Sequence, residues 1–364
     1  MPKPAISRRD FLKLAGLGAG TLALRPFTRG LFLPDFPAAE RLGRNCTGGM
    51  IAVKSRPDAY STTVKDVYED TVFPWLREVA AENFDYNRIN QRWVETPEGY
   101  VYASYLQPCR SLPNTPLAAL PDGKPGFWAE VTMPYVDFTM DNPPARSPGL
   151  SYLIREGLPT RLYYSQVMWI DQVSTNSSGA VIYRVNENEG HGYGYGDMYW
   201  AEGAAFRPLT EDEIAPIHPD VDPNTKKVVV NRTYQTLSCF EGDKEVYFCR
   251  VSTGVKDEYT PVGEYITGRK AVSIHMAGGT VDEGFDTPGV SWTTLFSGAG
   301  LAIHAAFWHN QFGEKRSHGC VNCKPEDAKW IFRWTTPSVT LDVSDVEAQY
   351  PNGGTHVIVK ERLY

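Results

Sequence analysis

The sequence predicts a mainly β protein that is divided into several folded segments and contains one clear helix. Glycine, proline and tyrosine are abundant, at 32, 27 and 20 of 364 residues, and this composition favours turns and aromatic-rich strands over long helices. Short runs of β-branched and aromatic residues alternate with polar residues, as in half-buried strands. Helical spacing is clear at 326–334, where Ala328, Ile331 and Phe332 share one face.

Residues 1–30 hold a positive charge that the rest of the chain lacks. Their net charge is +5, whereas the remaining residues carry −12. Arg8 and Arg9 precede a short, glycine-rich apolar run, which is the pattern of a twin-arginine export signal. We therefore expect export to the cell envelope, with residues 11–24 as a candidate membrane anchor; a basic amphipathic helix is the alternative. The acidic remainder has no basic stripe, which argues against a nucleic acid partner.

The first folded segment is predicted at residues 41–110. A strand is expected at 51–55 and a hairpin at 93–102, with its turn at 97–99. Residues 103–108 then close the segment. This pattern of short strands resembles a bacterial SH3-like barrel.

The second folded segment, residues 115–214, repeats this plan more loosely and is also expected to be SH3-like. It differs by a long insertion at 121–150. Alternating strand patterns occur at 161–164, 167–170, 180–185 and 199–201. The aromatic residues of both segments fit a hydrophobic core better than a platform for ligands.

The third domain is predicted at residues 226–344, after a linker at 215–225 that three prolines stiffen. Residues 345–364 are expected to form a C-terminal strand and tail. Alternating runs predict a β-meander at 227–231, 235–240 and 246–254, and further strand-like runs at 339–343 and 355–359.

The third domain contains the run Ser317-His318-Gly319-Cys320-Val321-Asn322, and His304 lies sixteen positions upstream of Cys320. The thiolate is the attacking form of a cysteine nucleophile, and a nearby histidine can serve as its base. Gly319 lets a substrate carbonyl approach the backbone, whose N–H groups at Gly319 and Cys320 can hold an oxyanion. The helix that begins near Pro325 is expected to help a thiolate at Cys320 modestly.

These residues resemble the signature of the YkuD-like L,D-transpeptidases of bacterial cell walls, which is a His followed by Ser/Thr-His-Gly-Cys-apolar-Asn or Arg. Similar segments occur at 260–265, 273–276 and 289–292. The resemblance covers about residues 226–344, roughly one third of the chain.

The resemblance implies acyl transfer between peptidoglycan stem peptides. The Cys320 thiolate would attack the third residue of one stem, and terminal D-alanine would leave with a proton from His304. An amine of a neighbouring stem would resolve the thioester to a 3→3 cross-link. The family needs no metal or organic cofactor, and it is a target of carbapenems. We expect a monomer that acts on peptidoglycan stem peptides.

The resemblance also implies roles for the other polar residues near Cys320. His304 is expected to be the base, although a histidine after an apolar run also fits a core position. His318 and Ser317 are expected to shape the oxyanion loop with Gly319, and His318 remains a candidate for proton transfer. The residues expected to contact substrate are Asn322, His309 and His275; His309 is also the rival base, and Met276 fits either the cleft or the core.

Three other functions remain open at this point. An L,D-carboxypeptidase or amide hydrolase of the same fold would use the same residues and differ only in admitting water. A cell-wall-binding protein with a relic catalytic domain is disfavoured because both His304 and Cys320 are present. A papain-like protease is disfavoured because its cysteine precedes its histidine. The SH3-like modules would bind the cell wall or act as a spacer.

The six cysteines allow several pairings in an oxidising compartment. Cys46 and Cys109 lie at the two ends of the first segment, where a disulfide would close it. Cys239 and Cys249 flank a hairpin turn, but the turn would set Cys239 opposite about Val246 rather than opposite Cys249.

Cys320 and Cys323 form a C-x-x-C pair. Such a pair can be a redox dithiol or half of a zinc site, although no second C-x-x-C exists to complete the zinc site. Reversible oxidation of Cys320 with Cys323 would switch the enzyme off.

Overall fold

Strands dominate the structure, which confirms the mainly β prediction. The computed structural model describes residues 32–188, 196–256, 259–278, 284–349 and 353–362. The predicted export signal at 1–30 lies outside these residues. Among the helices in the described ranges, none is long and apolar enough to cross a membrane.

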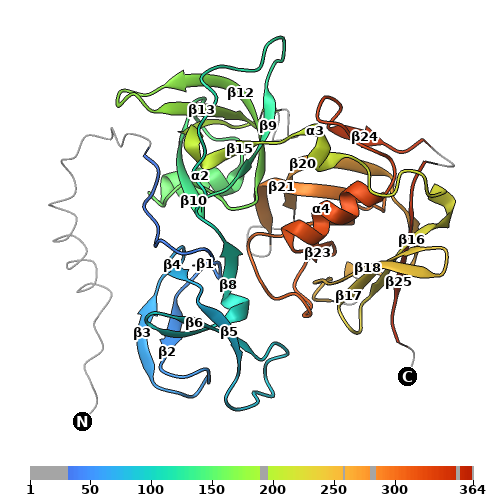
Figure 1. Ribbon diagram of the computed structural model, residues 1–364, viewed down its shortest axis with the longest axis horizontal. Helices are drawn as coiled ribbons and strands as arrows, with labels where there is room; N and C mark the ends of the chain where they lie inside the picture. The colour runs from blue at the N-terminus through green and yellow to red at the C-terminus, as the bar shows by residue number, and fades with distance from the viewer. Residues whose placement is uncertain (1–31, 189–195, 257–258, 279–283, 350–352, 363–364) are drawn as a thin grey trace.

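The first module, residues 42–109, consists of two small antiparallel sheets around one core (Figure 1). Three strands pair in the order β4-β1-β8 and five in the order β3-β2-β7-β6-β5. Gly99 is required in the β6–β7 turn because its φ is +136° and a Cβ would lie 2.5 Å from the Lys54 carbonyl oxygen. The elements are β1 (Leu42–Asn45), β2 (Ile51–Lys54), β3 (Thr63–Val67), β4 (Val72–Pro74), β5 (Arg77–Ala80), β6 (Arg92–Thr96), β7 (Gly99–Tyr102), the 3-10 turn η1 (Ala103–Tyr105) and β8 (Leu106–Cys109).

The second module, residues 127–208, contains one seven-stranded sheet in the order β11-β10-β14-β13-β12-β9-β15. The residues expected to be an insertion, 121–150, instead supply β9 and β10, which pair inside this sheet. Sequence spacing alone did not show that pairing because both partners are distant in the chain. The elements are β9 (Phe127–Val131), β10 (Tyr135–Met140), α2 (Pro148–Arg155), β11 (Arg161–Tyr163), β12 (Val167–Thr175), β13 (Val181–Asn186), β14 (Met198–Glu202), the 3-10 turn η2 (Gly203–Ala205) and β15 (Phe206–Pro208).

The two modules share one local feature that the sequence indicated. In each, a hairpin leads through a single 3-10 turn into a closing strand, by way of η1 in the first module and η2 in the second. The assignment of both modules as SH3-like stays a prediction.

The third domain contains two five-stranded sheets, in the orders β18-β17-β16-β25-β19 and β23-β22-β21-β20-β24. The predicted meander is present as β16, β17 and β18. A short helix, α3 (Glu211–Ile214), immediately precedes the predicted linker at 215–225, and the linker ends in the 3-10 turn η3 (Pro223–Thr225). The elements of the domain are β16 (Lys226–Asn231), β17 (Thr236–Glu241), β18 (Lys244–Arg250), β19 (Gly263–Ile266), β20 (Arg269–Gly278), β21 (Phe285–Leu295), β22 (Ala302–Ala305), β23 (Val321–Cys323), α4 (Pro325–Trp334), β24 (Asp345–Glu347) and β25 (His356–Lys360).

The C-terminal segment belongs to the third domain rather than forming a separate tail. β25 lies inside the first sheet, parallel to β16 and antiparallel to β19. The strand expected at 339–343 is absent from that range, and β24 at Asp345–Glu347 pairs with β20 instead. These pairings join residues more than 70 positions apart, so local patterns could not fix them.

Helix α4 forms where its sequence predicts, and two buried lysines complete its C-terminal end. Pro325 occupies the first turn, and the apolar face of the helix packs into the core of the domain. Lys270 Nζ donates hydrogen bonds to the carbonyl oxygens of Phe332 and Thr335, and Lys226 Nζ donates to that of Trp334 at 3.2 Å. These bonds satisfy carbonyls that a helix end leaves unpaired.

The register of the first module rules out the disulfide considered for Cys46 and Cys109. Cys109 pairs with Leu42, whereas the backbone N–H of Cys46 donates to the Tyr105 carbonyl. Four residues of strand separate the two cysteines, which is about 13 Å and beyond the reach of a disulfide. All six cysteines are free thiols in the structure.

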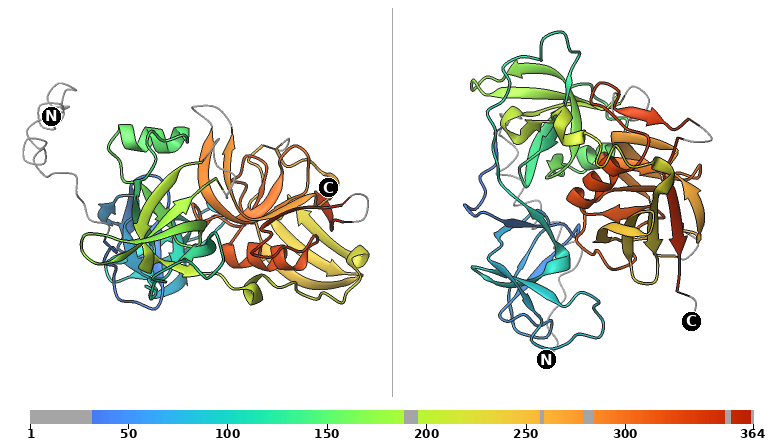
Figure 2. Two further views of the ribbon diagram at one scale, coloured as in Figure 1. Left: turned by 90° about the horizontal axis from the view of Figure 1, so that it is seen from above. Right: turned by 45° about the vertical axis from the view of Figure 1, so that its right-hand side comes forward.

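Both modules lie on the same side of the third domain (Figures 1 and 2). Trp128 and Val167 of the second module belong to the same hydrophobic cluster as the core of the third domain. A hydrogen bond of 2.6 Å from Gln166 to the carbonyl of Pro288 joins the same two parts. The second module and the third domain therefore pack through a continuous apolar contact.

Candidate active site

Parallel pairing of β22 with β23 brings the two main candidates together. His304 pairs with Asn322 in this register. Cys320 lies two residues before Asn322, and side chains alternate along a strand. Cys320 therefore lies immediately before the strand that pairs with the strand of His304, two residues from the residue opposite His304.

Cys320 is the one cysteine among the six that is only partly buried. Burial by the surrounding protein raises the pKa of the thiol to about 11, although a hydrogen bond from the Ala302 backbone acts in the opposite direction. β23 separates Cys320 from the start of α4. The modest thiolate stabilisation expected from the helix is therefore not what sets this pKa.

His304 is buried, with 2% of its surface exposed. Its Nδ1 lies 2.9 Å from the Ala305 carbonyl oxygen, and because a carbonyl can only accept, Nδ1 carries the proton and Nε2 the lone pair. Burial lowers the pKa of His304 to about 4. Near neutral pH the pair is thus an uncharged thiol and an uncharged imidazole.

The nucleophile loop is held by hydrogen bonds from its own serine and from Thr260. Ser317 Oγ accepts from the Gly319 N–H at 3.0 Å and donates to the Cys320 carbonyl. Thr260 Oγ1 donates to the Gly319 carbonyl at 2.6 Å and accepts from the Gly254 N–H at 2.9 Å. The Gly319 N–H is therefore engaged in this state, and the predicted oxyanion role would require it to change partners.

Gly319 cannot be replaced without moving the loop. Its φ is +141°, and a Cβ would lie 2.7 Å from the Tyr259 carbonyl oxygen and 3.0 Å from Leu301 Cδ2. The motif glycine is thus fixed by both backbone conformation and space.

His309 and Asn322 form a buried contact at β23, the strand that follows Cys320. His309 Nε2 lies 2.9 Å from the Asn322 side-chain amide, and its Nδ1 accepts from the Gln311 N–H at 3.2 Å. Burial, with Arg316 and His304 nearby, lowers the pKa of His309 to about 3. Substrate binding by His309 and Asn322 stays a prediction.

His318 is exposed beside two aromatic side chains that the sequence did not single out. Its ring centroid lies 6.4 Å from that of Tyr259 and 5.4 Å from that of Phe285. Both neighbours come from distant segments, so no local pattern could have indicated them.

The structure places His275 in a buried ionic cluster between the second module and the β20–β21 hairpin. Its Nδ1 lies 3.0 Å from Glu187, and its Nε2 is hydrogen-bonded to Asp286. Burial opposes the charged ring, but the hydrogen bonds to Asp286 and Glu187 raise the pKa of His275 to about 9. Asp286 also accepts from the Gly149 N–H at 2.6 Å, at the start of α2. The expected contact of His275 with substrate stays a prediction.

Sequence reasoning missed the segment that flanks the nucleophile strand. Ser252 and Asn322 exchange two backbone hydrogen bonds of 2.9 Å, and Gly254 forms a parallel bridge with Ser317. Gln235 supports this segment by accepting from the Thr253 N–H at 2.8 Å. No residue type in these positions is diagnostic, so only the fold reveals their role.

The second cysteine of the C-x-x-C pair faces away from the first. Cys320 lies before β23, whereas Cys323 is the last residue of that strand, and side chains three positions apart point to opposite sides of an extended chain. Cys323 is buried and makes a side-chain contact with Cys249. In the described parts of the chain, no group of three or more His, Cys, Asp or Glu side chains is placed to hold a metal ion.

Residues 225–359 match the YkuD family, which is described as the L,D-transpeptidase catalytic domain. The third domain is therefore an L,D-transpeptidase catalytic domain of the YkuD family, and the resemblance drawn from the motif is confirmed for it. The matched segment is less than half of the chain.

Individual relatives match smaller parts. L,D-transpeptidase 2 of Mycobacterium tuberculosis (strain CDC 1551 / Oshkosh) is 32% identical over 88 residues, which are 22% of this chain and 22% of that protein. This chain thus spans less than a quarter of the curated relative that it matches.

Two solved structures show weak similarity. L,D-transpeptidase 3 from Mycobacterium tuberculosis is 18% identical with a TM-score of 0.31, covering 52% of this chain and 93% of that chain. The catalytic domain of the E. faecium L,D-transpeptidase is 22% identical with a TM-score of 0.29, covering 37% and 96%. TM-scores this low support no conclusion about this chain.

Proposed function

We propose that this protein is an L,D-transpeptidase that cross-links peptidoglycan stem peptides through a thioester on Cys320. The observation that supports the proposal is the β22–β23 pairing within a YkuD-family domain, in which His304 lies opposite Asn322, two residues after Cys320. A cysteine beside a neutral histidine can attack a peptide carbonyl and retain the acyl group.

The first half-reaction forms the thioester. Cys320 Sγ bonds to the carbonyl carbon of the third stem residue while His304 Nε2 accepts the thiol proton. His304 then donates this proton to the nitrogen of the departing D-alanine as the C–N bond breaks. Because the free pair is uncharged, negative charge develops only during attack, so backbone donors near Cys320 matter most at that moment.

The second half-reaction releases the acyl group. The amine of a neighbouring stem attacks the thioester carbonyl and gives a proton to His304, and Cys320 leaves as the thiol. One peptide bond is broken and one is formed over the cycle. Access of the amine, rather than of water, decides between cross-linking and hydrolysis.

We further propose that the chain is exported by the twin-arginine route and acts in the cell envelope as a monomer, with residues 11–24 as a candidate anchor. The support for this is the Arg8-Arg9 pair and the apolar run that follows it.

Mass spectrometry of the reduced full chain after incubation with a carbapenem tests the nucleophile. We expect one covalent adduct on the peptide containing Cys320, no adduct in Cys320→Ala, and a normal adduct in the control Cys323→Ala, which removes the buried thiol three residues away. A wild-type chain without an adduct, or an adduct that persists in Cys320→Ala, would overturn the assignment.

Product analysis tests the reaction itself. Stem tetrapeptides incubated with the wild-type chain should yield 3→3 dimers, which Cys320→Ala should not produce. Trimmed tripeptides without dimers would show a hydrolase instead.

A further inference from the structure

Residues 305–312, which are the last residue of β22 and the loop after it, are held from outside their own domain. Asn310 Nδ2 donates to the carbonyl oxygen of Ala103 in the first module at 3.0 Å. The ring of Phe307 stacks on that of Tyr163 in the second module, with centroids 5.9 Å apart. Both modules therefore contact the stretch of chain that joins His304 to the nucleophile loop.

Arg44 of the first module makes the third of these contacts. Its Nη2 donates to the Phe307 carbonyl oxygen at 3.2 Å and to Gln107 Oε1 at 2.8 Å, and its Nη1 donates to Asp70 Oδ1 at 2.6 Å. The guanidinium also lies 4.0 Å from the centroid of the Tyr163 ring. Only 2% of Arg44 is exposed, and a buried guanidinium requires partners in fixed positions.

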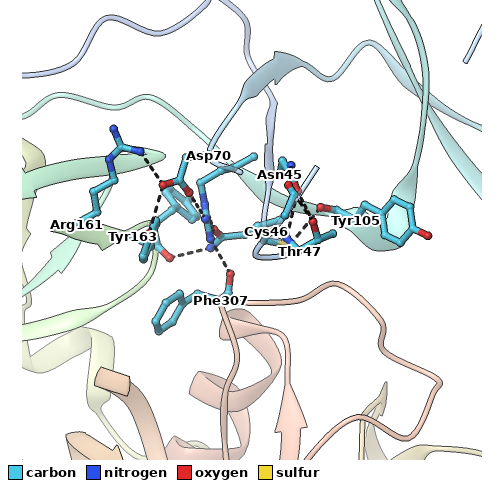
Figure 3. Close-up of polar contacts among 12 residues, drawn as sticks. Asn45, Cys46, Thr47, Asp70, Tyr105, Arg161, Tyr163 and Phe307 are labelled. Atoms are coloured by element: carbon cyan, nitrogen blue, oxygen red, sulfur yellow. Dashed lines mark hydrogen bonds and ion pairs between the residues drawn. The ribbon is translucent and has the colours of Figure 1, made fainter. Parts of the chain in front are cut away.

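Asp70 connects this arginine to the second module. It is buried with a φ of +63°, and its Oδ2 accepts from Arg161 Nη1 at 2.7 Å and from the Tyr163 hydroxyl at 3.3 Å. Figure 3 shows Asp70 between Arg161 and Tyr163, with Phe307 of the third domain beside them. We call Arg44, Asp70, Tyr163 and Phe307 the three-way junction.

The junction leads directly to the proposed base. Trp308 follows Phe307, and its ring centroid lies 5.8 Å from that of His304 and 6.2 Å from that of His309. His309 in turn contacts Asn322 in the strand that begins after Cys320. A shift of the loop would therefore change the packing around His304 and the strand next to Cys320.

We propose that Arg44 is a positioning residue for acyl transfer, through which the N-terminal modules complete the active site of the third domain. This inference rests on the proposed function. It assigns to the modules a part in the geometry of His304, in addition to any binding or spacing role. The observed bonds support this role. The Arg44 guanidinium donates to the Phe307 carbonyl of the loop, and its partner Asp70 accepts from Arg161 of the second module.

The test compares acylation of the wild-type full chain by a carbapenem with that of Arg44→Met. We expect the first-order acylation rate constant to fall by about 10- to 100-fold, as for small misplacements of catalytic groups, with less than about a threefold change in the half-saturating concentration. Arg92→Met is the matched control, since Arg92 is an exposed arginine of the same module paired with Glu78, and should acylate like wild type. Asn310→Ala removes the other link to the first module without deleting a charge, and should cause a smaller loss.

Hydrogen exchange gives a second readout. Arg44→Met should speed amide exchange in 305–312 while the amides of β16 and β17 stay protected. Wild-type acylation constants with unchanged exchange in both Arg44→Met and Asn310→Ala would overturn the inference. A uniform loss of protection with both kinetic constants altered would also overturn it, because it would show a general structural role. If the wild-type chain is not acylated, the proposed function fails, and exchange in 305–312 still decides whether Arg44 positions the loop.

Discussion

The reactivity of Cys320 toward a simple alkylating agent should rise steeply with pH and show no plateau near neutrality. The pKa of its thiol is raised from an ordinary 9.0 to about 11 by burial, and the pKa of His304 is lowered to about 4. Both shifts oppose a preformed thiolate–imidazolium pair. The thiolate fraction should therefore grow about tenfold per pH unit throughout the range from pH 6 to pH 10, which lies below the pKa of about 11.

The size of the effect follows from these values. At pH 7 a thiol with a pKa of about 11 is roughly one ten-thousandth thiolate, whereas one at 9.0 is about one hundredth. Higher basicity makes the thiolate a better nucleophile, by about tenfold over two pKa units at a Brønsted coefficient of about 0.4–0.5. Cys320 should thus react about tenfold more slowly than a free cysteine at pH 7.

Timed iodoacetamide labelling of the native chain from pH 6 to 10, read by peptide mass spectrometry, checks this prediction. A cysteine-containing model peptide serves as the reference, and Cys320→Ala gives the background from the five buried thiols. A rate that levels off below pH 8, or that exceeds the reference at pH 7, would refute the reasoning by showing a preformed ion pair.

Two further predictions concern the motif glycine and the buried histidine. Gly319→Ala forces a side chain into a backbone conformation that L residues rarely adopt, at a cost of about 1–3 kcal/mol, and places its Cβ 2.7 Å from the Tyr259 carbonyl oxygen. Carbapenem acylation should therefore slow by at least about tenfold, and a wild-type rate would contradict this prediction. Burial opposes the charged form of His275, but Asp286 and Glu187 raise its pKa to about 9. The charge therefore adds at most about 3 kcal/mol to the free energy of unfolding. This contribution is complete below about pH 6.5 and is lost as the pH rises through about 9. The difference in thermal unfolding midpoint between wild type and His275→Gln should therefore shrink from pH 6 to pH 9.5 in calorimetry, and a constant difference would argue against a charged His275.

The second module shows which strand pairings local sequence patterns can predict and which they cannot. The hairpin of β13 and β14 was evident from alternation because its two strands are neighbours in the chain. The pairing of β9 with β12 and β15 was not, since strands that pair across long separations leave no local mark. Residues 121–150 thus resembled an insertion although they supply part of the sheet.

The candidate site likewise contains some residues whose contacts are local in the chain and others whose partners are distant. Ser317, Gly319 and Cys320 lie within one short loop, and the hydrogen bonds of Ser317 Oγ join neighbouring residues of the motif. The bond from Thr260 to the Gly319 carbonyl spans 59 positions and could not be predicted from the motif. His275 and Cys323 are of residue types that suggest function, but their partners Glu187 and Cys249 lie more than 70 positions away. Residue type alone could not distinguish a substrate contact from a buried ion pair.

The sequence by itself determined the mainly β class, the helix α4 and the residues of the Cys320 motif, because these depend on alternation, helical spacing or a short run of neighbouring residues. Only the tertiary structure decided that β25 completes the first sheet of the third domain and that Arg44 reaches the loop after His304. Those contacts join residues more than 100 positions apart. They form because burying a strand edge or a guanidinium is favourable only when every polar group finds a partner, and the whole chain must fold to supply it.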